Sequence, residues 1–594
     1  MFSQLSVDTS LYILSFLSLP DVLKLYRVSR DIRHFLEENE TAIFHQLAIL
    51  HRFVSPGVTL EDVVEGEHVR GHWLDGVKTW KALCRRCLTL ERNWSGLGSV
   101  TEGGYLSYSS DVRWFRVDDL ERTVLAITET TPKRTLSVRA LEDGRLLWSL
   151  PAVNGLDLSN GYLLLWRNNG GIEIWRRAND VVNASASIAS PLREPSPLAA
   201  TASQLKQSPF ALDAKSRPRD LRGVYLPHGF LPSFTGAPFR ITRFKAPWLA
   251  VVDVEAAHVI RLYDVEQGTL LRSFDLDAIV QENVRGQQPT QFVLLDIDIS
   301  GEYLCACFDA ALVVVSIQEE DLASASAKTP ALVYMEHQGP FEVKQIALQL
   351  SKGASKEPST PSGGTVYTRN GVSVVKASGA HALEVHDVVP STPEKGEEIS
   401  RALVRPSARW TSCFVSARFS PDGRHLIAGT AFSLLYLLPD FSRLLRGIAK
   451  DTDIVQKLHV NEPVRDLAWD IQRHRVALRT EPGDTFIVDL HPGYHTQTNM
   501  ATAPTAVSFD HARLLRLRDF SSLYGAVFGN LQMRQTGVWF VWDIAQMHED
   551  VRSRVKEQGN ALTYGPRMDG RPIHQADLDE KAVSVCFVEF ADRF

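Results

Sequence analysis

Most of the chain follows one recurring pattern of short apolar segments separated by turns. The pattern is clearest in three stretches, which are IDISGEYLCACFDAALVVVSI at 297–317, FSPDGRHLIAGTAFSLLYLLPD at 419–440 and LAWDIQRHRVALRTEPGDTFIVDL at 467–490. Each contains an apolar strand, a turn, a second strand and a third apolar strand. Between residues 100 and 275, similar β-rich runs are separated by Asp-Gly, Asn-Gly and Gln-Gly turns, which are typical of hairpins. The pattern predicts a series of small antiparallel sheets.

Repeats of roughly 40 to 50 residues, each forming a small sheet, predict a β-propeller. Each blade need only bury its two faces against its neighbours, so the repeats need not be similar in sequence. The repeat length predicts about seven blades over residues 100–594. The last alternating run, AVSVCFVEF, is expected to close the ring by pairing within the first blade, which leaves no open sheet edge. Three polar, aperiodic segments are predicted to be disordered insertions or surface loops: 183–223, 351–365 and 388–400.

The first fifty residues have a different period and predict four short helices. Leu11, Leu14 and Leu17 recur at helical spacing, and Ser18 with Asp21 has the pattern of a capping box that begins a second helix. Helices this short cannot enclose a core that covers all of their apolar side chains. The remaining surface must pack on the rest of the chain or on another protein. We favour a docking face over an internal cap, because the unit precedes a linker and does not lie between blades.

The segment LSVDTSLYILSFLSLPDVLKLYRVSRDIRHFLEENETAIFHQLA resembles the F-box. The matching positions are Leu5, Ile13, Phe16 and Leu17, then LPDVLKLYRVSR, and then Phe44, where the family usually has Trp. The later TWKALCRRCLTLERNW resembles the helical linker that joins an F-box to a WD-repeat propeller, and it ends in Asn93-Trp94. The resemblance implies a multidomain protein, with a small all-α F-box at 3–48, a helical linker at 49–99 and an all-β propeller at 100–594.

This resemblance implies the substrate receptor of an SCF-type cullin-RING ubiquitin ligase. The F-box would dock on the adaptor subunit, and through it on a cullin. The propeller would hold a protein substrate, phosphorylated in some receptors of this kind, for ubiquitination and proteasomal degradation. The residues that we expect to contact the adaptor are Leu5, Leu14, Leu17, Pro20, Leu23, Val28 and Phe44. Some of these must form the small core of the unit, and periodicity does not separate the two groups.

Two other functions stay open: a scaffold that binds the adaptor without a cullin, and an enzyme with an active site in the propeller. The sequence contains no G-x-S-x-G elbow, P-loop, H-E-x-x-H motif or dinucleotide-binding glycine pattern, which argues against the enzyme. His381 and His386 are expected to be solvated loop histidines. Cys84 and Cys87 lack a second ligand pair nearby, which favours two cysteines one helical turn apart over a zinc or redox site. We expect no metal, cofactor or catalytic residue.

Charge and hydropathy limit the classes of partner and the cellular compartment that we expect for this chain. A formal net charge of −6, without long blocks of like charge, gives no reason to expect nucleic-acid binding. We interpret Arg217, Arg219 and Arg222 as part of a solvated insertion, so no substrate-binding residue is assigned. The longest apolar runs, such as FSLLYLLP at 432–439, are shorter than a membrane helix, and MFSQLSVDTS has no signal-peptide pattern. We expect an intracellular protein, cytoplasmic, nuclear or both, that does not bind membranes.

Overall fold

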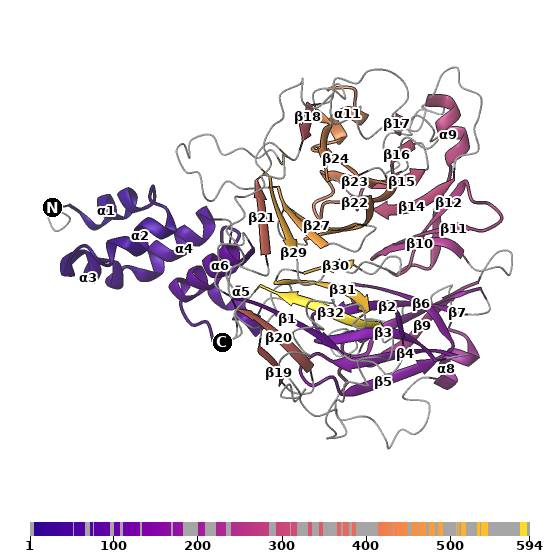
Figure 1. Ribbon diagram of the computed structural model, residues 1–594, viewed down its shortest axis with the longest axis horizontal. Helices are drawn as coiled ribbons and strands as arrows, with labels where there is room; N and C mark the ends of the chain where they lie inside the picture. The colour runs from indigo at the N-terminus through magenta and orange to yellow at the C-terminus, as the bar shows by residue number, and fades with distance from the viewer. Residues whose placement is uncertain are drawn as a thin grey trace, which may run out of the picture.

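The chain forms a helical unit at its N-terminal end and a ring of small sheets over the remainder (Figure 1). The computed structural model describes residues 5–51, 53–65, 72–74, 76–94, 100–106, 111–130, 133–167, 170–181, 200–207, 221–232, 239–283, 293–308, 311–317, 331–335, 344–347, 365–369, 372–378, 383–387, 414–431, 433–449, 454–460, 463–470, 474–480, 485–490, 507, 509, 512–517, 531–534, 536–543 and 583–590.

The first part of the helical unit contains four short helices, as the sequence predicts: α1 (Val7–Leu14), α2 (Leu19–Leu25), α3 (Arg30–Glu38) and α4 (Glu40–Leu50). The predicted capping box at α2 is present in part: the Ser18 hydroxyl accepts a hydrogen bond from the Asp21 backbone N–H, as an N-cap does, but the Asp21 carboxylate accepts from the Ser18 hydroxyl at 2.6 Å in place of the Ser18 backbone N–H. Ser29 caps α3 by accepting a hydrogen bond from the Ile32 backbone N–H. Because α1 ends at Leu14, Leu17 lies in the turn after it.

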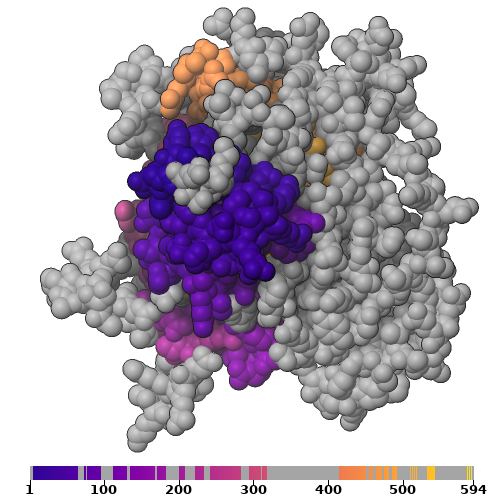
Figure 2. All heavy atoms as spheres, turned by 90° about the vertical axis from the view of Figure 1, so that its left-hand side faces the viewer, coloured from indigo at the N-terminus to yellow at the C-terminus, as the bar shows by residue number. Residues whose placement is uncertain are grey.

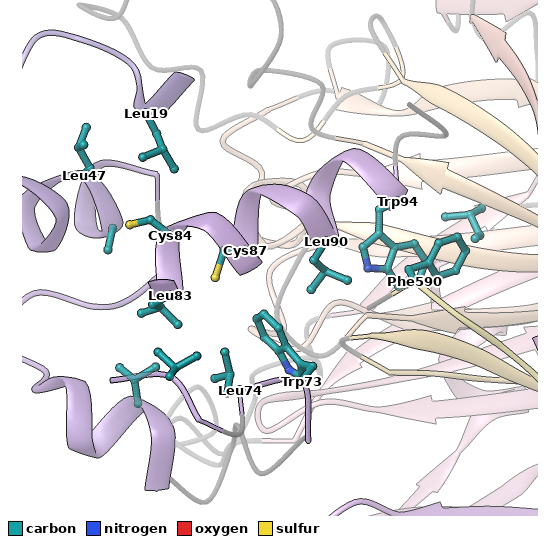
Figure 3. Close-up of a cluster of buried hydrophobic side chains, with 14 of the residues drawn as sticks. Leu19, Leu47, Trp73, Leu74, Leu83, Cys84, Cys87, Leu90, Trp94 and Phe590 are labelled. Atoms are coloured by element: carbon teal, nitrogen blue, oxygen red, sulfur yellow. The ribbon is translucent and has the colours of Figure 1, made fainter. Parts of the chain in front are cut away.

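The helices continue through α5 (Leu60–Glu65), the short η2 (His72–Leu74) and α6 (Trp80–Trp94). Figure 3 shows α6 extending from side chains of the first helices, such as Leu19 and Leu47, to Phe590 beside the sheets. All of these side chains belong to one buried apolar cluster. The predicted boundary between an F-box and a linker at residues 48 and 49 therefore does not divide the packing. It falls inside α4, whose buried residues pack together with those of α6.

The strands of the described residues form seven sheets. Four of these sheets have four strands each, in sequence order. They are β2 (Asp111–Asp118), β3 (Thr123–Thr130), β4 (Lys133–Ala140) and β5 (Leu146–Pro151); β6 (Val153–Ser159), β7 (Tyr162–Arg167), β8 (Ile172–Arg177) and β9 (Tyr225–Leu231); β10 (Phe239–Lys245), β11 (Trp248–Asp253), β12 (Val259–Asp264) and β13 (Thr269–Asp275); and β14 (Leu294–Ile299), β15 (Tyr303–Phe308), β16 (Ala311–Ser316) and β17 (Ala331–Met335).

The other three sheets contain strands that are distant in sequence. One has the order β18 (Lys344–Ala347), β25 (Gln456–His459), β24 (Leu434–Leu438), β23 (Leu426–Thr430) and β22 (Phe414–Phe419). The next has the order β21 (Leu383–Asp387), β29 (Arg513–Leu517), β28 (Thr485–Asp489), β27 (Arg475–Thr480) and β26 (Val464–Trp469). The last has the order β19 (Thr365–Arg369), β20 (Val372–Ser378), β1 (Val100–Leu106), β32 (Val583–Glu589), β31 (Gly537–Asp543) and β30 (Leu531–Met533).

The sheets follow one another around a centre. The innermost strands contact each other in the order β2, β6, β10, β14, β22, β26 and β30, and β31 and β32 of the last sheet contact β2 again. This arrangement is that of a β-propeller. The three stretches with the shared sequence pattern fall on β14 to β16, β22 to β24 and β26 to β28, so the meanders are confirmed.

The predicted closing strand is present, but it lies in the last sheet and not within the first blade, which is formed by β2 to β5. The run AVSVCFVEF contains β32, which pairs antiparallel with β31 on one side and with β1 on the other. β1, the first strand of the ring, thus joins β30, β31 and β32 in the sheet nearest the end of the chain. Pairing with β1 covers the edge that β32 would otherwise leave open.

Polar side chains connect neighbouring inner strands. These contacts are Arg116 to Asp157 at 2.8 Å, Arg243 to Asp298 at 2.6 Å, Arg418 to Asp466 at 3.5 Å, the Leu531 N–H to Asp466 at 3.1 Å, and the Val117 N–H to the Gln532 side chain at 3.0 Å. Burial raises the pKa of Asp466, while the carboxylates around Arg418 outweigh its own burial and raise the pKa of the guanidinium. These contacts connect β2 to β6, β10 to β14, β22 to β26, β26 to β30 and β30 to β2.

The predicted insertions agree with the structure only in part. In 183–223, residues 200–207 contain the short helix α8 (Ala202–Gln207), whose Gln204 is fully buried, so this part is ordered and not disordered. Residues 351–364 and 388–400 lie outside the described residues, whereas Thr365 begins β19. Two further helices, α9 (Leu276–Asn283) and α11 (Ser442–Leu445), contact β17.

Candidate functional site

Exposed apolar side chains are concentrated at the N-terminal end of the helical unit. Of the fifteen large apolar residues that are exposed in the described part of the chain, seven lie within residues 5–50. Six of them belong to α1, to the residues flanking it and to the turn after α2. We call these six the N-terminal apolar surface: Leu5, Val7, Tyr12, Ile13, Phe16 and Val28. Figure 2 shows that the helical unit, in indigo, stands out from the ring on the viewer's side.

The packing of α1 turns this surface outward. Ser6 caps the helix by accepting a hydrogen bond from the Thr9 backbone N–H, and one face of the helix then places Ser10 and Leu14 in the core. Tyr12 and Phe16 lie on the opposite side, with exposed fractions of 67% and 63%. Their rings form a T-shaped pair with centroids 4.9 Å apart. Two large aromatic side chains therefore present one joint surface to solvent.

The structure separates the seven residues that the sequence analysis assigns to adaptor contact. Leu5, Pro20 and Val28 are exposed, and Leu17 and Leu23 are half-buried. Leu14 and Phe44 are buried, with exposed fractions of 2% and 0%. The assignment of these two residues to a contact surface is therefore wrong for this conformation. They form the core of the helical unit, and a partner could contact them only if the helical unit opened.

Sequence reasoning missed four residues of the N-terminal apolar surface, which are Val7, Tyr12, Ile13 and Phe16. A signal was present for Ile13 and Phe16, because both match the F-box pattern. The apolar spacing drew attention to Leu11, Leu14 and Leu17 instead. In a helix of only eight residues with apolar positions all round, periodicity does not show which side is covered.

One buried side chain of α1 has no partner. Ser10 is fully buried, and its hydroxyl has no hydrogen-bond partner among the described residues. We expect Ser10→Ala to raise the free energy of unfolding by about 1 kcal/mol, because it removes an unsatisfied polar group and suits a helix better. Ser6→Ala is the control of opposite sign, since loss of the N-cap should lower this free energy by about 1 kcal/mol. Urea denaturation measures both, and a lower stability for Ser10→Ala would contradict the assignment.

The opposite end of the helical unit is anchored in the ring. The Asn93 side chain donates a hydrogen bond to the Phe590 carbonyl at 2.6 Å, and the rings of Trp94 and Phe590 stack at 3.9 Å. The buried Arg475 at the start of β27 pairs with Glu91 and lies over the Trp94 ring at 5.2 Å. Burial alone would lower the pKa of Arg475, but the carboxylates of Glu91 and Asp489 raise it, so the guanidinium stays charged. We call Glu91, Asn93, Trp94, Arg475 and Phe590 the joint.

The two cysteines of α6, which are free thiols, are part of the same core. Cys84 and Cys87 are buried on α6, and the Cys84 thiol donates a hydrogen bond to the Phe44 carbonyl at 3.3 Å. Burial raises the pKa of the Cys84 thiol, which keeps it protonated. Within the described residues, no group of three His, Cys, Asp or Glu side chains is placed to hold a metal ion.

Two other sequence interpretations need correction. Arg222 is not a solvated residue of a flexible insertion, because it pairs with Glu142 at 2.6 Å and donates to the Glu121 carbonyl at 2.6 Å. Arg217 and Arg219 lie outside the described residues. His386 does not belong to a loop. It lies in β21, where its backbone is paired with that of Leu514 in β29. His381 is outside the described residues.

None of the helices in the described parts of the chain combines the length and the apolar character that crossing a bilayer requires. No protein-family model matches the chain, and no curated protein matches it.

Solved structures similar to the chain include WD40 repeats and a β-propeller domain. They include the WD40 repeats of RRP9, with 10% identity, a TM-score of 0.38 and coverage of 82% of this chain and 97% of that one. U3-55K has 11% identity, a TM-score of 0.38 and coverage of 82% and 98%. The β-propeller domain of Cps50 (Swd1) from Myceliophteria thermophila has 11% identity, a TM-score of 0.35 and coverage of 74% and 95%. Likenesses this distant add nothing to the strand pairings, which are the basis for assigning the fold.

Proposed function

We propose that the chain is the substrate-recognition subunit of an SCF-type ubiquitin ligase. In this proposal the helical unit acts as an F-box and binds the adaptor subunit, and through it a cullin. The propeller, which we take to have seven blades because seven sheets follow one another around the ring, holds the protein to be ubiquitinated. The single observation that carries the proposal is the N-terminal apolar surface.

An exposed surface of this kind favours docking over an internal cap. The helical unit already has a core, formed by side chains such as Leu14, Leu19 and Phe44, and α6 already anchors it to the ring. Tyr12, Phe16 and Val28 contribute to neither and stay in water. Covering an aromatic side chain with a partner removes apolar area from water at about 25 cal/mol per Å². A partner protein thus has an energetic reason to bind here.

The joint supports a role in positioning. A receptor of this type supplies no nucleophile or acid, and it acts by holding a substrate at high local concentration beside the enzyme that carries ubiquitin. This requires the adaptor-binding surface and the substrate-binding ring to keep a fixed geometry. The stacked rings of Trp94 and Phe590 and the buried pair of Glu91 and Arg475 are contacts that would maintain it.

Affinity purification of the full chain from cells tests this function. We expect the adaptor subunit and a cullin to be recovered together with the chain. Recovery of the adaptor without a cullin would favour the scaffold instead, and recovery of neither would contradict the proposal. A variant with Tyr12→Asp and Phe16→Asp, which changes only exposed positions, should lose both subunits at once because the cullin is reached through the adaptor.

A further inference from the structure

The short helix α8, at the lower right of Figure 1, lies in the connection between β8 and β9 and builds its own start. The Thr201 N–H donates to the side-chain oxygen of Gln204 at 2.8 Å, and the Gln204 N–H donates to the Thr201 hydroxyl at 3.2 Å. This reciprocal pair is a capping box, formed by a Thr-x-x-Gln sequence. The local sequence therefore presents one helical turn with Gln204 and Gln207 three positions apart.

Side-chain amides hold α8 on the sheet. Gln204 is fully buried, and its amide nitrogen donates to the Gly229 carbonyl of β9 at 2.9 Å and to the Ile174 carbonyl of β8 at 3.4 Å. The side-chain oxygen of Gln207 accepts a hydrogen bond from the Arg167 guanidinium. No apolar side chain of α8 is buried, and Leu205 is 54% exposed. The contact between α8 and the sheet is thus polar and depends on two amides.

The receiving site is preformed by the sheet. Arg167 is buried at the end of β7, where its guanidinium pairs with Glu173 at 3.0 Å and donates to the Ala152 carbonyl at 3.2 Å. The pairing of β8 with β9 shifts register just after Ile174 and Gly229, which places the two acceptor carbonyls at a bulge. The site offers two hydrogen-bond acceptors, the Ile174 and Gly229 carbonyls, where Gln204 binds, and one fixed donor, the Arg167 guanidinium, where Gln207 binds. A glutamine amide satisfies the acceptors, whereas a glutamate carboxylate has no donor for them.

We propose that this site, the amide socket, formed by Arg167 and the Ile174 and Gly229 carbonyls, binds a short helical peptide with a Gln-x-x-Gln turn. It is filled in cis by α8 and can accept the same turn from a partner protein. Exchange is feasible because a helix of six residues is not stable by itself, and each of its hydrogen bonds replaces one to water with little net gain. What keeps α8 in place is its tether, which raises its local concentration.

A labelled peptide with the sequence LAATASQLKQSP, residues 198–209, tests the socket by fluorescence polarisation. The full chain carrying Gln204→Ala and Gln207→Ala, whose own helix can no longer fill the socket, should bind the peptide about tenfold more tightly than the wild-type chain does. Replacing the first glutamine of the peptide by glutamate should weaken binding about tenfold, because the two donor bonds are lost. Arg167→Lys, added to the doubly substituted chain, should weaken it as well, because the planar fork is lost.

The two possible failures are distinct. Absence of binding to the doubly substituted chain, with a thermal transition like that of the wild type, would overturn the proposal. Equal binding to all chains, whatever stands at positions 167, 204 and 207, would place the peptide elsewhere and would overturn it too. Should the double variant fail to fold, the single Gln204→Glu variant, which keeps the side-chain shape, replaces it, with the same two outcomes contradicting the socket.

Discussion

The full chain carrying Tyr12→Asp and Phe16→Asp is expected to bind the purified adaptor subunit at least about a hundredfold more weakly than the wild type. Aromatic residues at the centre of an interface often contribute 2 kcal/mol or more each, and a carboxylate enclosed in an apolar contact adds a desolvation cost. Both residues are largely exposed in the free chain, so the substitutions should leave its thermal transition unchanged. Isothermal titration calorimetry with the adaptor measures the affinity.

The matched control places the same charge on an exposed apolar residue of the ring. Ile448 is 63% exposed, the same fraction as Phe16, and it lies just after α11. Ile448→Asp should leave adaptor affinity unchanged. Retained affinity in the Tyr12 and Phe16 double variant would show that the adaptor binds elsewhere on the chain. Leu14→Asp would not be informative, because Leu14 is buried and its loss would unfold the helical unit.

Local patterns predicted the elements of this fold well, because each depends on residues close in sequence. Ser18 begins a helix as expected, since a cap needs only the next turn of the chain. The meanders follow from alternating apolar residues and tight turns, and the closing strand β32 follows from the same alternation. In all of these cases, the physical cause lies within about ten residues of the element.

The sides of the short helices could not be predicted in the same way. Which face of α1 is covered depends on how the helical unit packs around its common core, and this is not encoded in the spacing of Leu11, Leu14 and Leu17. Ser10 lies inside although it is polar, whereas Tyr12 and Phe16 lie outside. A tertiary arrangement decides these positions, and each helix is too short to have one clearly polar side.

Composition misled the prediction at α8. The segment around it is rich in Ser, Ala and Pro, which is typical of disorder. A single buried side chain, Gln204, nevertheless finds two carbonyls on strands β8 and β9. Average composition cannot detect an interaction that depends on one residue and on partners about thirty residues away in the chain.

The second large effect is expected at the joint. Trp94→Ala should lower the free energy of unfolding by about 3–5 kcal/mol, because it removes a buried indole and leaves a cavity beside Phe590. It also removes the ring over which Arg475 lies. Trp94→Phe is the matched control, since it keeps a ring that can stack on Phe590 and should cost much less. Urea denaturation of the three chains measures the difference.

The functional consequence of the joint can be measured separately from stability. With spin labels at positions 34 and 448, one on an exposed position of α3 in the helical unit and one on the ring, the distance distribution should be narrow in the wild type and broad in Trp94→Ala. Adaptor affinity should be unchanged, because the N-terminal apolar surface is at the far end of the helical unit (Figure 1). Under the proposed function, ubiquitin transfer to a bound client should fall, since the client would no longer be held in a fixed position relative to the conjugating enzyme. An equally narrow distribution in Trp94→Ala would show that other contacts keep the two parts in place.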